Sequence, residues 1–474
     1  MKKFLVLALA ASALMTACGD DDEMDSMNGT GGASAEAGET GGSGGESGSS
    51  AARTFTVTIE NVAAVKPFTS SGVFNTPEGD DKAGPLTPGK TYEFTVDAGR
   101  KQKLSFVTML AATNDLFFAP KGDGIAFYDE NGEPISGDVT DQIYLWDAGT
   151  ELNEEPRVGP NTVSKQGAPD TGPAENGDVV AIGDADDDFD FEYPEASDVM
   201  TVTLTHLEGT EFQVTIENVS SATALQTSEG DFPAPLSPGV WVVHSGADPL
   251  FTVGMPDRGQ GLEHIAEDGN PMMLAELITA SSGITYPASP GVWVVHAAGT
   301  RPLFEQGSAD YGEGLEHIAE DGNPMMLGAN LADAEGYRSG AIFDMPAGSS
   351  GPGPITPGKS YELRFEAMPG ESLSFATMLA ATNDVFFGPA DTGIALFDAN
   401  GEPLNGDITG ELSLWDVGTE SNEQPGIGPT TVTNQAAPDT GNPGEASVQL
   451  LEDVEDGYEY PSVDAVLRVT VTSE

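Results

Sequence analysis

The sequence predicts an all-β protein made of two antiparallel β-sandwich domains, with short helices in an inserted segment. Apolar and polar residues alternate in short runs such as TFTVTIENV at 54–62 and VMTVTLTHL at 199–207. Gly, Pro, Asn and Asp interrupt these runs at regular intervals, as turns do between short strands. A long stretch of the chain also occurs twice, which predicts two domains of one fold.

The longer repeat sets the predicted domain boundaries. LSFVTMLAATNDLFF at 104–118 recurs as LSFATMLAATNDVFF at 373–387, and the strand at 54–62 returns as EFQVTIENV at 211–219. Taken in chain order, these copies predict one sandwich at 54–208 and another at 211–474.

A shorter repeat lies within the second copy, at 238–327. PGVWVVH occurs twice there, and GLEHIAEDGNPMML occurs unchanged at 261–274 and 314–327. The latter predicts a short helix that stops at Asp-Gly-Asn, followed by a second helical turn that opens at proline. The first copy therefore lacks this helical module and the second has it twice. One module either protrudes from the second sandwich or complements the first.

Two kinds of turn are predicted between the strands. Asn-Gly at 131–132 and 400–401 is typical of tight hairpin turns, because it accommodates positive φ angles. LWDAGTE at 145–151 and LWDVGTE at 414–420 each end an apolar strand in a glycine-containing turn with an acid on either side. These two phrases are the first candidates for a binding site.

The N-terminus predicts export and lipidation. Lys2 and Lys3 precede an apolar run from Phe4 to Leu14, which is too short to span a bilayer. Met-Thr-Ala before Cys18 resembles a bacterial lipobox, which predicts a signal peptide at 1–17 and a lipid on Cys18. The alternative is an ordinary secretory signal peptide with an incidental cysteine. Because Cys18 is the only cysteine, no intrachain disulfide can form.

The next segment and the overall charge indicate an extracellular setting. Gly, Ser, Ala and acids dominate 18–53, which predicts a disordered acidic tether. Gly19 after Cys18 favours the outer membrane or cell surface, with the lipid as the contact to the membrane. A net charge of −59 argues against nucleic acid and bare anionic lipid as partners, since both attract basic patches.

Three motifs together resemble the spondin domain family. The first is SF-x-TM followed by an Asn-Asp loop, and the second is an apolar strand ending in Asp-x-Gly-Thr-acid. The third is a Gly-Leu-Glu-x-x-Ala-Glu-x-Gly helix preceded by a strand that ends in histidine. The resemblance implies a β-sandwich similar to calcium-dependent lipid-binding modules, with loops gathered at one end.

The resemblance also implies one calcium ion in each sandwich. The family's ligands are an acid after the SF-x-TM strand and two acids flanking the Gly-Thr turn. Carried onto this chain, the set is Asp115, Asp147 and Glu151 in the first copy, and Asp384, Asp416 and Glu420 in the second. Glu151 and Glu420 stand where the family has aspartate.

Elementary coordination chemistry agrees with this hypothesis. Calcium takes six to eight oxygen ligands, and carboxylates supplemented by carbonyls and waters suit it. Gly149 and Gly418 would let two acids four residues apart face one centre. These loops contain neither thiolate nor histidine, which disfavours zinc and copper there. The alternative is that the acids cap turns or face water.

Three weaker motifs favour an acidic loop, structural histidines and core packing. An alternating acidic run half-resembles an EF-hand but has Phe189 where glycine is needed: Asp184, Asp186, Asp188, Asp190 and Glu195. The shorter repeat carries two histidines in each copy, and these favour structural roles over metal binding: His244, His264, His296 and His317. Core packing is predicted for the duplicated tryptophans and methionine pairs: Trp241, Trp293, Met272, Met273, Met325 and Met326.

The sequence thus predicts a non-enzymatic cell-surface lipoprotein with tandem calcium-binding domains, serving adhesion or the binding of an extracellular glycan, matrix or protein ligand. The predicted strands and turns provide no Gly-x-Ser-x-Gly elbow, no His-Glu-x-x-His pair and no phosphate-cradling Gly-rich loop after a strand. One alternative is a structural spacer or assembly component stabilised by calcium. A remote alternative is a hydrolase that uses acidic residues.

Overall fold

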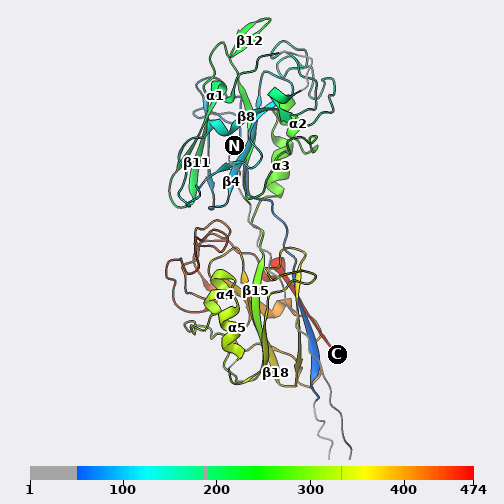
Figure 1. The fold of residues 1–474 in the computed structure, drawn as a ribbon, viewed down its shortest axis with the longest axis vertical. Coiled ribbons are helices and arrows are strands. Elements are labelled where there is room, and N and C mark those ends of the chain that lie inside the picture. The colour runs from blue at the N-terminus through cyan, green and yellow to red at the C-terminus, as the bar shows by residue number, and fades with distance from the viewer. Residues whose placement is uncertain (1–50, 186–190, 333) are drawn as a thin grey trace, which may run out of the picture. The chain divides into compact units, whose positions relative to one another are not determined.

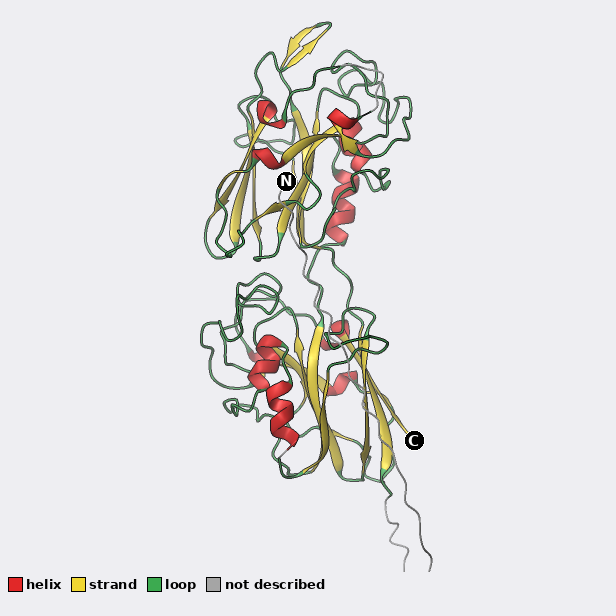
Figure 2. Ribbon diagram, in the orientation of Figure 1, coloured by secondary structure: helices red, strands yellow, loops and turns green. Residues whose placement is uncertain are grey.

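Antiparallel strands form the framework of the computed structural model, which describes residues 51–185, 191–332 and 334–474. They form two β-sandwiches, each with a four-stranded sheet and a seven-stranded sheet (Figures 1 and 2). The all-β prediction is therefore confirmed. The predicted signal peptide at 1–17, Cys18 and most of the tether at 18–53 lie outside the described residues.

The first sandwich contains strands from the middle of the chain. Its smaller sheet has the order β3 (Thr91–Asp97), β11 (Glu211–Asn218), β10 (Met200–His206) and β7 (Gly137–Asp138). Its larger sheet has the order β2 (Phe68–Phe74), β14 (Leu236–His244), β4 (Lys103–Leu110), β5 (Leu116–Pro120), β8 (Ile143–Asp147) and β9 (Val180–Ala181), with β6 (Ile125–Ala126) also paired to β4. A separate hairpin joins β12 (Leu225–Thr227) to β13 (Gly230–Phe232).

The second sandwich repeats this topology. Its smaller sheet has the order β17 (Ser360–Ala367), β1 (Arg53–Asn61), β24 (Leu467–Ser473) and β21 (Gly406–Asp407). Its larger sheet has the order β16 (Tyr337–Phe343), β15 (Ala288–Ala297), β18 (Glu371–Leu379), β19 (Val385–Pro389), β22 (Leu412–Asp416) and β23 (Gln449–Leu450), with β20 (Ile394–Ala395) also paired to β18.

Short helices complete both units. The α-helices are α1 (Ala196–Val199), α2 (Leu262–Asp268), α3 (Met272–Ala280), α4 (Leu315–Asp321), α5 (Met325–Ala332) and α6 (Val463–Val466). The 3-10 helices are η1 (Thr140–Gln142), η2 (Ile182–Asp184), η3 (Thr409–Glu411) and η4 (Leu451–Asp453). The sequence prediction for the GLEHIAEDGNPMML segments is confirmed, because α2 ends just before Gly269, which has a φ of 65°, and α3 begins after Pro271. None of the helices in the described residues has the length and apolar composition of a membrane span.

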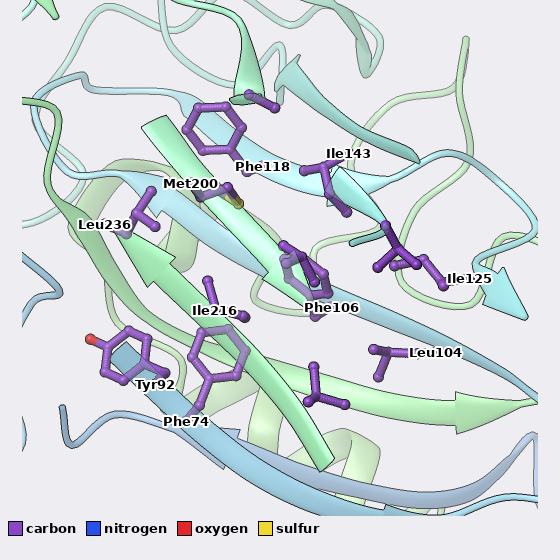
Figure 3. Packing of buried hydrophobic residues seen from close by; sticks show 14 of the residues in the cluster. Phe74, Tyr92, Leu104, Phe106, Phe118, Ile125, Ile143, Met200, Ile216 and Leu236 are labelled. Atoms are coloured by element: carbon purple, nitrogen blue, oxygen red, sulfur yellow. The ribbon is translucent and has the colours of Figure 1, made fainter. Parts of the chain in front are cut away.

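Each sandwich has two apolar layers. Figure 3 shows the core between the two sheets of the first sandwich, where Phe106 and Ile216 come from opposite sheets and are fully buried. A second layer packs α2 and α3 on the other face of the larger sheet, through residues such as Ile265 and Ile278. Burial of each such side chain contributes about 1.5–3 kcal/mol. The helical module is therefore an integral part of the sandwich.

Strand pairing differs from the predicted boundaries of 54–208 and 211–474. Strand β1 pairs along its length with β17 and β24, and it lies beside the C-terminal strand in Figure 1. The equivalent strand in the first sandwich is β11, which pairs with β3 and β10. The chain thus places its first strand in the second sandwich, builds the first sandwich, and then returns.

The same pairing accounts for the duplicated helical module. Strand β14 lies between β2 and β4, and its helices α2 and α3 pack in the first sandwich. Strand β15 lies between β16 and β18, with α4 packed in the second sandwich. The prediction that the first sandwich lacks the module is wrong. The alternative in which one module complements the first sandwich agrees with the structure.

Candidate metal centre

The predicted acids lie where two adjacent strands meet the end of the larger sheet. Asp115 immediately precedes β5, and Asp147 is the last residue of β8. Because β5 and β8 run antiparallel with Leu116 opposite Asp147, the start of one strand adjoins the end of the other. In the second sandwich the same register sets Val385 opposite Asp416, so that Asp384 adjoins it.

The turn after β8 wraps around the carboxylate of Asp115. The Thr150 amide donates to Asp115 Oδ2 at 2.8 Å, the Thr150 hydroxyl contacts Oδ1 at 2.5 Å, and the Glu151 amide donates to Oδ2 at 3.0 Å. Gly149 has a φ of 69°, and a Cβ atom there would lie 2.8 Å from the Asp178 carbonyl oxygen. The glycine is therefore required both by its conformation and by the close approach of the next loop.

The second sandwich repeats these contacts. The Thr419 hydroxyl lies 2.8 Å from Asp384 Oδ1, and the Glu420 amide donates to Asp384 Oδ2 at 3.0 Å. Gly418 has a φ of 77°. The Gly418 amide donates to Asp416 Oδ1 at 2.6 Å, as the Gly149 amide does to Asp147 Oδ1 at 2.7 Å. The prediction of a sharp glycine turn between two acids is confirmed in both copies.

Asp115 and Asp147 come together with a third acid, Glu175. Each offers a carboxylate oxygen, and the three oxygens lie within 4.8 Å of one another. Asp115 is fully buried and Asp147 is 1% exposed. Burial raises the pKa of Asp115 well above its ordinary range, and the adjacent charge of Asp147 raises it further, although three hydrogen bonds from the turn oppose the shift.

Asp384 and Asp416 form the corresponding buried pair. Burial raises the pKa of Asp384, and the charge of Asp416 adds to the shift. Burial likewise raises the pKa of Asp416. Two adjacent ionised carboxylates this deeply buried repel each other, and neither carries a hydrogen-bond donor for the other. The pair therefore needs either a shared proton or a cation.

No ion pair reaches either central carboxylate. Within residues 51–185, 191–332 and 334–474, Lys, Arg and His side chains form ion pairs with neither Asp115 nor Asp384. Burying an ionised carboxylate without a compensating charge is costly. A divalent cation between the paired carboxylates would remove that cost and match their all-oxygen chemistry.

Glu151 lies differently from the prediction. Its amide binds Asp115, but its carboxylate accepts hydrogen bonds from the Gly172 amide at 2.5 Å and from Asn114 Nδ2 at 3.2 Å. The Glu420 carboxylate likewise accepts from the Gly441 amide at 2.6 Å. The structure therefore does not group all three predicted side chains of a copy around one centre. The glutamates' carboxylates instead bind the loop that carries the repeated APDTG sequence.

Sequence reasoning missed three acids near the turn. Asp170 belongs to the APDTG repeat and Glu267 to the repeated helix α2, so both repeats pointed to them. Glu175 gave no such signal. The Glu175 amide donates to the Thr150 carbonyl oxygen at 2.9 Å. In the second copy Gly444 occupies this place, and its amide donates to the Thr419 carbonyl oxygen at 2.9 Å.

The strand-end histidines are structural, as predicted. His244 Nε2 lies 2.9 Å from Ser105 Oγ and its Nδ1 lies 2.7 Å from the Gly246 carbonyl oxygen. His296 Nε2 lies 2.9 Å from Ser374 Oγ. Both side chains are buried. The histidines on the helices have a different environment. His317 Nδ1 lies 4.0 Å from Asp321 Oδ2 and 3.5 Å from Asp439 Oδ1, and the three side chains could together hold a metal ion.

The packing predictions succeeded for tryptophan and failed for methionine. Trp293 is 8% exposed, and Trp241 stacks on Phe94 with ring centroids 5.3 Å apart. The methionine pairs are exposed instead, by 41–63%: Met272, Met273, Met325 and Met326. They occupy the first turns of α3 and α5, whereas the buried faces of these helices begin at the leucine that follows each pair. Most of the acidic run that half-resembles an EF-hand, 186–190, lies outside the described residues.

Comparison with models of known protein families and with curated proteins found no match to this chain.

Proposed function

We propose that the chain is a non-enzymatic, calcium-binding protein of a bacterial cell surface, held by a lipid on Cys18 and built from two spondin-like sandwiches. The observation that carries the calcium proposal is the buried acid pair, Asp115 with Asp147, repeated as Asp384 with Asp416. A pair of adjacent buried carboxylates is unfavourable when ionised, and its appearance at the same register in both sandwiches indicates one chemical requirement met twice.

Burial argues for what the ion would do. Asp115 and Asp384 are fully buried, and Asp147 and Asp416 are only 1% and 4% exposed. An ion held by these groups would have little room to contact a large external ligand. Its role would be structural: it would link the start of β5 to the turn after β8 in the first sandwich, and the start of β19 to the turn after β22 in the second. The ordered loop surface would then bind an extracellular glycan, matrix or protein ligand.

Calorimetry on the full chain in about 150 mM KCl tests the calcium proposal, because salt at this concentration screens weak binding to surface acids. We expect the Asp147→Ala, Asp416→Ala double variant to lose one calcium ion from each sandwich. The control is Glu78→Gln, Glu362→Gln, which removes the same formal charge from exposed positions and should bind calcium as the original chain does. Unchanged calcium uptake by the Ala variant would exclude this site.

The buried position of the acid pair also favours a second candidate function, a calcium-stabilised spacer or assembly component. Attachment of the full chain to polysaccharide-coated surfaces separates the two functions. If chelation of calcium lowers thermal stability but leaves attachment intact, the spacer function is favoured. If attachment is lost at temperatures where the chain stays folded, the calcium-ordered loops bind the ligand.

A further inference from the structure

A second group of acids lies beside the buried pair of the first sandwich. Its members are Glu151 in the turn after β8, Asp170 in the APDTG loop and Glu267 near the end of α2. Their ligand-capable oxygens lie within 4.8 Å of one another. The Thr150 hydroxyl separates the two groups, since it lies 2.5 Å from Asp115 Oδ1 and 2.8 Å from Glu267 Oε1.

The Glu267 carboxylate lacks the partners that a buried carboxylate needs. The residue is 3% exposed, and its Oε2 atom is buried without a hydrogen-bond partner among the described residues. Its other oxygen faces the Thr150 hydroxyl, which has a single hydrogen and also contacts Asp115. One hydroxyl cannot donate to both carboxylates at once. Glu267 is thus buried beside other acids with at most one shared donor.

No basic side chain compensates this group. Within the described part of the chain, none of the ion pairs involves Glu151, Asp170 or Glu267. The neighbouring residues of α2, Ile265 and Ala266, are fully buried in the apolar layer, so the helix cannot turn Glu267 outward without exposing them. An unpartnered buried carboxylate oxygen is costly, and a bound cation is a direct way to satisfy it.

We propose that Glu151, Asp170 and Glu267 bind a second divalent cation in the first sandwich, distinct from the ion assigned to Asp115 and Asp147. Three carboxylates and no nitrogen or sulfur ligand fit calcium. Asp170 is exposed, so this ion would have open positions for water or for an oxygen ligand from outside. This site, unlike the buried pair, is accessible to an acidic group of an external partner.

The second sandwich lacks this arrangement. Asp439, which occupies the place of Asp170 in the repeat, lies with its Oδ1 atom 3.5 Å from His317 Nδ1. Among the described residues, Asp439 offers a carboxylate oxygen within 4.8 Å of possible ligand atoms of His317 and Asp321. It forms no such cluster with Glu320 and Glu420. We therefore assign the second cation to the first sandwich alone. Glu320, the counterpart of Glu267, provides a matched control.

Native mass spectrometry and equilibrium dialysis of the full chain against calcium in about 150 mM KCl test the proposal. Glu267→Gln should bind one calcium ion fewer per chain than the original sequence, whereas Glu320→Gln should bind the same number. Asp115→Asn removes the other ion of this sandwich, so failure of one site is separable from failure of the other. Equal stoichiometry in Glu267→Gln and the original chain would overturn the proposal, as would an equal loss in Glu320→Gln.

A second variant keeps the test decisive if Glu267→Gln disturbs folding. Asp170→Asn changes an exposed loop residue and is not expected to affect the core. Loss of a group at a metal site typically weakens affinity by about tenfold or more, and we expect a decrease of this size for one ion only. Unchanged affinity in Asp170→Asn would exclude the site even if the Glu267 variant failed to fold.

Discussion

Removing calcium is expected to lower the free energy of unfolding of both sandwiches. Each ion that binds only the folded state contributes about 4 kcal/mol when its concentration is about 1,000 times the dissociation constant. For domains of this size the loss corresponds to a decrease in Tm on the order of 10 °C. The physical reason is that chelation leaves the acids of each pair buried side by side: Asp115 with Asp147 and Asp384 with Asp416.

Differential scanning calorimetry with and without a chelator measures this effect. The Asp115→Asn, Asp384→Asn double variant should show a much smaller difference in Tm between the two conditions, because one carboxylate of each pair is gone and only the second ion of the first sandwich remains. Glu78→Gln, Glu362→Gln is the charge-matched control and should keep the full dependence on calcium. A calcium-dependent Tm that survives unchanged in the Asn variant would show that the stabilising ions bind elsewhere.

Replacing Ile59 in strand β1 by alanine is expected to destabilise the second sandwich and to leave the first nearly unaffected. Ile59 on β1 is fully buried in the second core, opposite Tyr361 on β17 and Val469 on β24. Replacing a buried isoleucine by alanine costs about 2–5 kcal/mol through lost burial and the cavity left behind. The matched substitution is Ile216→Ala on β11, whose side chain is fully buried in the first core.

Hydrogen exchange detected by mass spectrometry assigns each effect to its sandwich. Ile59→Ala should accelerate exchange in 360–379 and 467–473, whereas Ile216→Ala should accelerate it in 91–97 and 200–206. Sequence order alone predicts the reverse assignment for Ile59, because position 59 falls within the predicted domain at 54–208. Faster exchange in 91–97 upon Ile59→Ala would contradict the strand pairing described above.

The alternation of apolar and polar residues made the β-sandwich architecture predictable. The near-identity of the two sequence copies, however, hid which strand belongs to which sandwich. Alternation in 54–62 predicts a half-buried strand, and β1 has this pattern of burial. Nearly the same residues occur in β11, so either strand satisfies the same position in either sandwich. Which sandwich each strand joins depends on the path of the chain between the two sandwiches. The local sequence does not contain that information.

The candidate metal centre was predictable where strand register determines it. Asp115 precedes the start of β5 and Asp147 ends β8, and these two strand ends are paired. A correct prediction of the two strands therefore brings the two acids together. Glu151 was predicted as a ligand of the same ion, but its side chain turns toward Gly172, in a loop with no regular structure to fix its approach. Glu267 escaped because α2 reaches the turn only through tertiary packing, although its repetition was visible in the sequence.

A crystal structure of the full chain grown in calcium, with anomalous data to identify the ion, tests the central claim most directly. We predict one calcium peak between the carboxylates of Asp115 and Asp147 and another between those of Asp384 and Asp416. Each ion should have oxygen ligands at about 2.3–2.6 Å. Carboxyl groups in direct contact at saturating calcium, with no anomalous density between them, would show that a shared proton holds each pair and would contradict the claim.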